Sequence, residues 1–295
     1  MYTFIAEEQA NPECAWSVTQ MCRVLQVSRS GFYDWQSRPP SEREVTDRLL
    51  AAEIEAIWEC SARTYGAPRV HAWLRRQGYR VARKRVARVM REHGWTGVMG
   101  RIRVPTTRRD NNAAPAADLV ARGFNPDAPD RIWAGDVTYL PTAQGWLYLA
   151  TVLDLYSRRV IGWALADHLR AGLVCDALTM AVATRGGHVH GVVFHSDRGC
   201  QYTSRQFRRL CARMGVTQSM GATGVCWDNS PSEAFFATLK RELVHRYTWV
   251  NRAVVRRAVA HWIEGWYNAR RLHSSISYLS PIDKEDSYLQ TARAA

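Results

Sequence analysis

The stretch GVVFHSDRGCQYTS, residues 191–204, places a carboxylate where folding alone does not require one. Residues 192–194 form a short apolar run after a glycine, a pattern that predicts a buried strand. Asp197 stands at the end of that strand, and a polar turn follows it. Burial of a charged group is costly unless a partner compensates it. The position of Asp197 therefore raises the question of a functional role.

The whole chain is strongly basic. Its 295 residues carry 40 Lys and Arg against 27 Asp and Glu, a net charge of +13 that is typical of proteins binding a polyanion. A solvated basic surface is the alternative. No apolar stretch is long enough for a transmembrane helix and the N-terminus lacks a signal-peptide pattern, so we expect a cytoplasmic, nucleoid-associated protein without membrane contact. The seven cysteines include no CxxC pair, which favours free thiols over structural zinc.

Residues 1–45 have the proportions of a helix-turn-helix. Ser17 and Gln20 fit a capping box at the start of a helix that would run to Leu25. Ser28 would begin a second short helix after a tight turn. An ordinary helical hairpin would give the same pattern, and the sequence leaves both interpretations open.

Residues 46–103 are predicted to form a second, basic helix-turn-helix-like domain. A helix is expected from about Ser41 to Cys60, and two more around a turn at residues 77–78. Between Arg63 and Arg91 there are ten Lys or Arg and no acid, which favours phosphate contacts over a merely solvated face. The predicted DNA contacts in this domain are Arg69, Arg80, Arg83, Lys84, Arg85 and Arg88.

The remaining chain changes character after a predicted linker at residues 104–125. Residues 126–248 read as three strands followed by alternating helices and strands, with five strands in all. This order predicts an α/β core in which helices flank a mixed five-stranded sheet. Residues 249–295 are predicted to be a helical extension, with one helix from about residue 251 to 268.

Three acids in this core stand out. Asp136 lies within the first strand, Asp197 ends the fourth, and Glu233 opens a long helix. If the first and fourth strands are neighbours, the three carboxylates converge and repel one another unless divalent metal binds. Oxygen ligands of this kind suit Mg²⁺ or Mn²⁺. Two such ions would activate a nucleophile and stabilise the leaving oxygen of a phosphodiester.

Plainer interpretations exist for two of these acids. Glu233 completes a capping box with Ser230, and Asp197 could be a turn residue paired with Arg198. Asp136 is harder to explain, because a strand interior offers it no obvious partner. The residues alone leave these alternatives open.

Several segments resemble a known family, the insertion-sequence-three family of bacterial transposases, at its second reading frame. The segment YGAPRVHAWLRRQGYRVARKRVARVMREHGW resembles the helix-turn-helix-like domain that precedes the catalytic core in that family. The segments that resemble its integrase-type core are WAGDVTYL, VLDLYSRRVIGWAL, FHSDRGCQYTS, DNSPSEAFFATLKREL and WYNARRLHSSISYLSP. The resemblance covers about residues 16–285, nearly the whole chain.

This resemblance implies a ribonuclease-H-like fold and a D,D(35)E triad made of Asp136, Asp197 and Glu233. The spacing fits, since 35 residues separate Asp197 from Glu233. Lys240, seven positions after Glu233 on the same helical face, is implied to contact DNA near the cut. A DNA transposase that cuts and transfers insertion-sequence ends follows as the expected function.

Further expectations concern partners and rival functions. The resemblance implies a homo-oligomer on terminal inverted repeats and target DNA, and a possible partner protein from an upstream frame. The alternatives are a catalytically idle DNA-binding regulator of transposition and a ribonuclease-H-like nuclease.

Other chemistry-bearing residues have two interpretations each. Asp154 would be a fourth metal ligand or, with greater weight, a turn-capping or Arg-paired acid. His195 would act near the metals or be a packed, hydrogen-bonded histidine. Trp262, Trp266 and Tyr267 are expected to pack between helices, with base stacking as the alternative.

Overall fold

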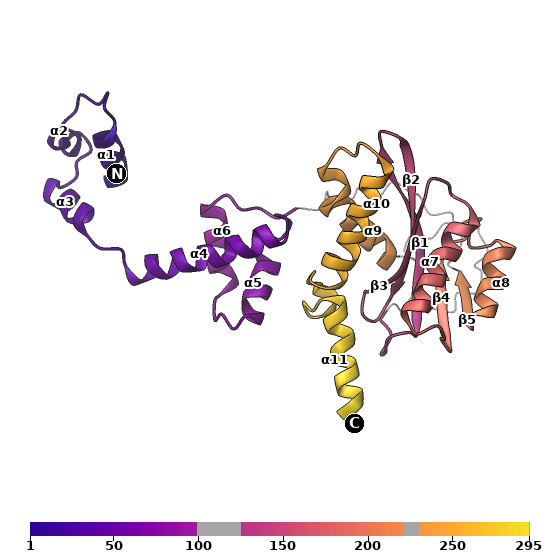
Figure 1. The fold of residues 1–295 in the computed structure, drawn as a ribbon. Coiled ribbons are helices and arrows are strands. Elements are labelled where there is room, and N and C mark those ends of the chain that lie inside the picture. Colours follow the sequence, from indigo (N-terminus) through magenta and orange to yellow (C-terminus); the bar gives the residue numbers. More distant parts are fainter. Residues whose placement is uncertain (99–124, 221–229, 295) are drawn as a thin grey trace, which may run out of the picture. The chain divides into compact units, whose positions relative to one another are not determined.

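The computed structural model describes residues 1–98, 125–220 and 230–294 of the chain (Figure 1). The chain divides into two compact units, Met1–Ala56 and Ile57–Ala295. The predicted linker lies outside the described residues except for its last position, residue 125. Within the described part of the chain, no helix is long and apolar enough to cross a membrane.

The first unit begins with three short helices, α1 (Tyr2–Ala10), α2 (Val18–Val24) and α3 (Arg29–Ser37). The predicted capping box is present, because the Ser17 side chain accepts from the Gln20 N–H and the Gln20 side chain accepts from the Ser17 N–H. Ser28 caps α3. The predicted pair of short helices is therefore confirmed. Helix α1 was not predicted, because a single buried residue gives it a weak apolar pattern. Their shared core contains Ile5, Met21, Cys22 and Phe32.

Three helices follow, α4 (Glu42–Cys60), α5 (Ala67–Arg76) and α6 (Arg83–Glu92). The turn after α5 contains Gly78 at φ +91°, a left-handed conformation that favours glycine. Helices α5 and α6 are amphipathic, with the basic side chains on the polar side. The residues that they bury are Val70, Leu74, Val86, Val89 and Met90.

Within the second unit, α5 and the turn before it contact the C-terminal segment. The Tyr65 hydroxyl accepts a hydrogen bond from the Leu272 N–H at 2.7 Å, and the Arg69 Nε donates to the Leu272 carbonyl at 3.1 Å. The rings of Tyr65 and Trp73 pack on Trp266, with centroids 5.4 and 6.4 Å away.

The core is a five-stranded sheet in the order β3-β2-β1-β4-β5. Strands β1, β2 and β3 are antiparallel neighbours, whereas β4 lies parallel to both β1 and β5. The strands are β1 (Ile132–Thr142), β2 (Gly145–Asp154), β3 (Val160–Ala166), β4 (Val192–Ser196) and β5 (Val216–Met220). The mixed five-stranded sheet predicted from the sequence is confirmed.

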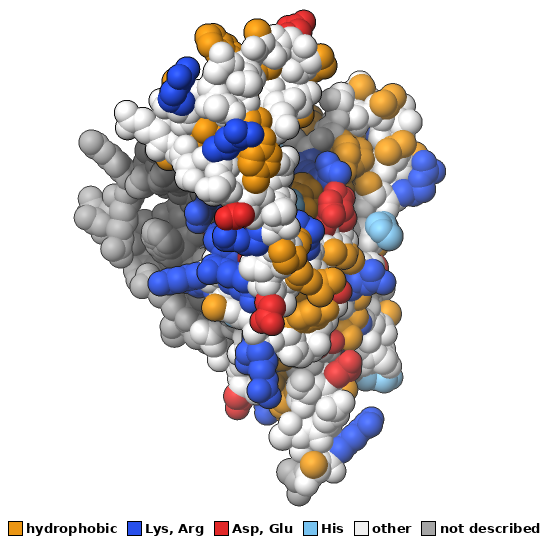
Figure 2. Space-filling view, turned by 90° about the vertical axis from the view of Figure 1, so that its left-hand side faces the viewer, with side chains coloured by type: hydrophobic (Ala, Val, Ile, Leu, Met, Phe, Trp, Pro, Cys, Tyr) orange, Lys and Arg blue, Asp and Glu red, His pale blue; other side chains and the backbone are white. Residues whose placement is uncertain are grey.

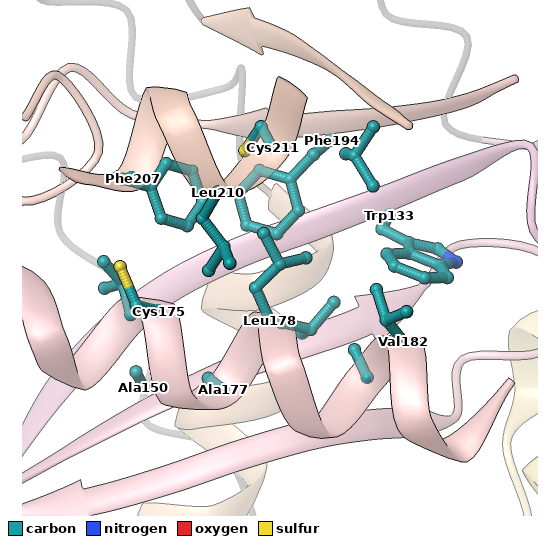
Figure 3. Packing of buried hydrophobic residues seen from close by; sticks show 14 of the residues in the cluster. Trp133, Ala150, Cys175, Ala177, Leu178, Val182, Phe194, Phe207, Leu210 and Cys211 are labelled. Carbon is teal, nitrogen blue, oxygen red and sulfur yellow. The ribbon is translucent and has the colours of Figure 1, made fainter. Parts of the chain in front are cut away.

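Helices cover both faces of the sheet (Figure 1). Helices α7 (Ala171–Thr184) and α8 (Arg205–Arg213) pack on one face. Figure 3 shows the core beneath them, where Leu178 of α7 and Phe207 of α8 meet Phe194 of β4. Helices α9 (Ser230–Glu242) and α10 (Arg252–His261) bury the other face against a second core.

The C-terminal extension is less regular than the single predicted helix. Helix α10 passes directly into a π-helical segment, Trp262–Asn268. Two short 3₁₀ turns, Val244–Arg246 and Ser274–Ile276, flank this region, and α11 (Pro281–Ala294) ends it. The π-helical segment turns Asn268 toward the sheet edge, where its side chain accepts from the Val160 N–H and donates to the Val160 carbonyl, each at 2.9 Å.

The edge strand β3 has further side-chain partners along its length. The Trp163 N–H contacts the Met180 sulfur at 3.4 Å, and the Arg256 guanidinium donates to the Leu165 carbonyl. Together with Asn268, these groups occupy backbone positions of β3 that face away from β2.

A buried ionic network joins the sheet to α7 and α11. Asp154 is fully buried and accepts hydrogen bonds from the N–H groups of Asp130 and Ser157, each at 2.8 Å. Glu285 of α11 accepts from Arg185 at 2.5 Å and from Arg159 at 2.7 Å. Asp154 is thus a turn-capping acid, the interpretation favoured from the sequence.

Replacement of Glu285 tests this network. Burial raises the pKa of Glu285, but hydrogen bonds and charges of Arg185 and Arg159 together hold it below 4.5. We expect Glu285→Gln to lower the free energy of unfolding by roughly 3 kcal/mol at neutral pH, because Arg185 loses its buried counter-charge. A depressed folded-state pKa means that this stabilisation is complete above pH 4.5 and is lost as the pH falls through the folded pKa.

The measurement is urea unfolding at several pH values, with Asp286→Asn as the control on the exposed side of the same helix. The difference between wild type and Glu285→Gln should shrink below pH 4.5. A difference that is constant across this range would contradict the ionic explanation.

Candidate active site

The register of β1 and β4 brings two of the predicted acids to one level of the sheet. Ala134 pairs with His195, and Asp136 and Asp197 each lie two residues beyond that pair on parallel strands. Neighbouring strands are about 4.8 Å apart, so the two positions are adjacent. The pairing of β1 with β4 covers Ile132–Ala134, which leaves the Asp136 side of β1 open toward Asp197.

Asp136 is largely withdrawn from solvent, and its Oδ1 accepts a hydrogen bond from the Val137 N–H at 2.8 Å. Burial raises its pKa to about 7; the Val137 bond opposes this, the charges of Asp197 and Glu233 add to it, and Lys240 opposes it. The three predicted acids therefore lie within electrostatic range of one another. Asp197 and Glu233, which come from other elements, act on Asp136 through their charges.

Asp197 lies on the exposed turn directly after β4. Its Oδ1 accepts a hydrogen bond from the Gly199 N–H at 3.0 Å, so the carboxylate shapes its own turn. A side chain at Gly199 would meet that same oxygen at 3.0 Å, which explains a glycine at this position. The turn therefore fixes Asp197 at the open end of β4.

Glu233 lies in the first turn of α9. The helix begins at Ser230 itself, so Ser230 is the first helical residue and not the cap of the predicted capping box. The capping position falls on residue 229, outside the described residues. Residues 235, 236 and 239 anchor α9 in the second core, and this packing directs Glu233 toward β1.

Lys240 lies two turns further along α9. Its Nζ is 4.9 Å from the ring centroid of Tyr139 on β1. Burial lowers the pKa of Lys240, whereas Asp136 raises it. The Lys240 ammonium group thus lies near the Tyr139 ring, and its charge acts on Asp136.

The end of α9 is anchored by a buried ion pair that the sequence did not reveal. Arg271 and Glu242 are 4% and 6% exposed, and Arg271 donates to Glu242 through Nε at 2.9 Å and Nη2 at 2.7 Å. The two residues are 29 positions apart, so no local pattern could have paired them. This pair fixes the helix that carries Glu233 and Lys240.

The ligand set suits a hard divalent cation in kind, since it consists of three carboxylates in a region of mutual repulsion. Within residues 1–98, 125–220 and 230–294, however, no group of three or more His, Cys, Asp or Glu side chains is arranged to hold an ion. The acids are therefore neighbours whose side chains do not converge on one point in this conformation.

Two of the open alternatives are resolved in favour of packing. His195 is buried, and its Nδ1 lies 3.1 Å from the Ser219 hydroxyl on β5. Trp262 and Tyr267 are core residues beneath α9, and Trp266 packs at the edge of that core. These aromatic rings are not available as a base-stacking surface.

The predicted DNA-contact residues differ in exposure. Arg80, Arg83 and Lys84 are exposed, whereas Arg85 and Arg88 are half-buried. Arg88 forms an ion pair with Glu92 at 2.8 Å. The Arg69 guanidinium group makes contacts within the protein, because it donates to the Leu272 carbonyl and lies over the Tyr65 ring. Exposed Lys and Arg side chains are drawn in blue on the face that Figure 2 shows.

The sequence of this chain is similar to family models and to known proteins. Models of the integrase core domain match residues 126–226 and 214–281, and a model of the HTH-like domain matches residues 44–103. The transposase InsF for insertion sequence IS3A of Escherichia coli strain K12 is 39% identical over 290 residues, which cover 98% of this chain and 99% of that protein. An uncharacterized 31 kDa protein of insertion element IS600 from Shigella sonnei is 35% identical over 92% of this chain and all of that protein.

Among solved structures, a chain of the simian T-cell lymphotropic virus intasome in complex with PP2A regulatory subunit B56 gamma is 15% identical. It covers 60% of both chains with a TM-score of 0.46.

The fold and the family matches define a DNA transposase with an integrase-type catalytic core of the ribonuclease-H-like class. The chain belongs to the IS3 family of transposases, which it matches over nearly its whole length.

A double-mutant cycle tests the anchor of α9. Arg271→Leu leaves Glu242 buried without its counter-charge, and we expect a loss of roughly 3–5 kcal/mol in the free energy of unfolding. Replacing both residues by Leu should recover much of that loss, because no unpaired charge remains. Chemical unfolding of the two single variants and the double variant measures the coupling. Strictly additive losses would contradict a direct interaction.

Proposed function

We propose that Asp136, Asp197 and Glu233 are the catalytic triad with which this transposase cuts the ends of its insertion sequence and joins them to target DNA. The observation that carries the proposal is the approach of these acids, from β1, the end of β4 and the start of α9, to within electrostatic range. Carboxylates so placed destabilise the fold when they are uncompensated. This cost favours a functional explanation over a structural one.

The carboxylates are proposed to bind two ions of Mg²⁺ or Mn²⁺. Such ions, when bound, supply positive charge that activates the attacking oxygen and stabilises the leaving oxygen of a phosphodiester. The Val137 N–H holds one oxygen of Asp136, and the Gly199 N–H holds one oxygen of Asp197. These bonds would leave the other carboxylate oxygen of each residue to bind an ion.

The reaction would proceed in two steps at the same acids. Water attacks the phosphorus at the insertion-sequence end, and the bond from phosphorus to the 3′ oxygen breaks to leave a free 3′-hydroxyl. That hydroxyl then attacks a phosphodiester of the target and displaces its 3′ oxygen. Because one phosphodiester replaces another in the second step, no external energy source is required. Lys240, beside Asp136, would hold a DNA phosphate near the cut.

The proposed division of labour follows the chain. Residues 1–45 and 46–103 would bind DNA, the linker at 104–125 would connect them to the catalytic core at 126–248, and residues 249–295 would form the helical extension. We further propose that the active form is a homo-oligomer on terminal repeats and target DNA, with a possible partner from an upstream frame. The site of action would be the bacterial nucleoid.

A joining assay tests the triad. Asp136→Asn, Asp197→Asn and Glu233→Gln should each reduce joining of pre-cleaved ends to a plasmid to background, because each removes a ligand charge. DNA retention should remain, since the basic helices are unchanged. Asp176→Asn, an exposed acid on α7, is the matched control and should retain full activity. Joining by any triad variant at the wild-type rate would contradict the assignment.

The same assay separates the rival functions. Joined products from wild type support a transposase, hydrolysis alone supports a nuclease, and retention without chemistry supports an idle regulator. Metal binding has an independent readout, because an ion that binds only the folded state raises the melting temperature. Mg²⁺ or Mn²⁺ should stabilise wild type and Asp176→Asn but not Asp136→Asn.

Salt dependence tests the basic domain. Alanine replacement of Arg80, Arg83 or Lys84 should reduce the slope of log affinity against log salt by about 0.9 for each phosphate that the protein no longer neutralises. Arg63→Ala is the control, because Glu59 already neutralises this exposed arginine at 2.8 Å. Filter binding over a salt series gives the slopes. Unchanged slopes in all three variants would place the DNA elsewhere.

A further inference from the structure

Two large aromatic rings stand exposed on the hairpin that joins β1 to β2. Tyr139 is 56% exposed and Trp146 is 49% exposed, and their ring centroids are 5.0 Å apart in an edge-to-face arrangement. Strand alternation explains the exposure, because the neighbouring residues Leu140 and Leu147 face the core and are fully buried. Neither ring belongs to a described hydrophobic core.

The hairpin that carries these rings is firmly held. The Thr142 hydroxyl donates to the Gly145 carbonyl at 2.6 Å and closes the turn. The Ala143 N–H donates to the Trp249 carbonyl at 2.9 Å, and the Gln144 side chain accepts from the Arg252 N–H at 3.1 Å. The aromatic pair is therefore preorganised, so that binding to it carries little ordering cost.

The pair lies next to the acids. Tyr139 is three residues beyond Asp136 on β1, a distance of about 10 Å at the rise of a strand. Lys240 bridges the interval, since its Nζ is 4.9 Å from the Tyr139 ring centroid and its charge acts on Asp136. Because they lie an odd number of positions apart, Tyr139 and Asp136 point to opposite faces of β1, and Lys240 links them at the edge of the strand that β4 leaves unpaired.

This combination fits one kind of ligand. Bases stack on aromatic rings whatever their sequence, and cations beside the rings hold the phosphates between them. A base within a duplex has both faces covered by its neighbours, so only an unpaired base can use such a surface. A protein partner that covered the rings would also have to accommodate the charge of Lys240, which a phosphate neutralises.

We propose that Tyr139 and Trp146 form a stacking platform for an unpaired DNA base next to the phosphodiester that is cut. The proposal rests on the proposed function, because it takes the acids as the position of the cut. The platform would hold the flanking nucleotide away from its complementary strand and so keep the scissile phosphate within reach of Asp136. Tyr139 and Trp146 are then positioning residues that act through the bound DNA.

Fluorescence of 2-aminopurine tests the platform directly. The probe is a duplex of the element's terminal sequence with a short unpaired overhang that carries 2-aminopurine next to the scissile phosphate. The full chain with Asp136→Asn keeps the DNA intact. We expect binding to quench the probe, and Tyr139→Ala or Trp146→Ala to abolish the quenching and weaken binding of the overhang by roughly 5- to 100-fold. Tyr139→Phe and Trp146→Phe should retain both, because stacking requires only a ring.

Controls separate the possible failures. Affinity for the same duplex with blunt ends should be unchanged in the alanine variants, which a folding defect would not allow. Equal quenching in wild type and the alanine variants would overturn the platform, even where wild type joins the ends in the plasmid assay. A changed oligomeric state in sedimentation with unchanged quenching would assign the surface to a second copy of the chain and overturn the proposal. Absence of joining by wild type would overturn the proposed function and the platform with it.

Discussion

The parallel pairing of β1 with β4 is the constraint on which the candidate site depends. It extends over three residues of each strand and ends at Ala134 and His195. Because both strands continue in the same direction from that pair, Asp136 and Asp197 lie side by side, each two residues beyond it. A shift of this register by one residue would turn Asp136 to the other face of the sheet, where α7 and α8 pack. Backbone hydrogen bonds between β1 and β4 therefore determine the relative positions of Asp136 and Asp197.

Close packing keeps this register fixed. A side chain at Gly135 would overlap the Phe194 ring, so the ring of β4 packs directly against the backbone of β1 beside the acids. Glu233 reaches the site by a different route, since it depends on α9, which the second core and the Arg271–Glu242 pair hold in place. Two acids are thus placed by strand pairing and one by helix packing. Burial is the main cause of the raised pKa of Asp136, and the charges of Asp197 and Glu233 add to it.

Much of this arrangement could be predicted from local patterns. Apolar runs and glycines indicated the strands of the core, and Asp136 drew attention because a strand interior offers a carboxylate no partner. Partners distant in sequence could not be predicted. The turn-capping role of Asp154 was favoured from the sequence, but its bond from the Asp130 N–H was not foreseen, and the pair of Arg271 with Glu242 has no local signal. Helix α9 also begins at Ser230 itself, one residue before the start that the predicted capping box implies.

Side chains bond to the outer backbone edge of β3, and this affects how copies of the protein behave when they are concentrated. An edge strand with free backbone groups is a template for another chain, which can add to the sheet and start aggregation. Here Asn268 imitates a neighbouring strand at Val160, and Met180 and Arg256 cover positions further along. Many copies bound close together on one stretch of DNA would therefore not pair with one another through the β3 edge. An assembly that used this edge would have to form through side-chain contacts, which can be made specific.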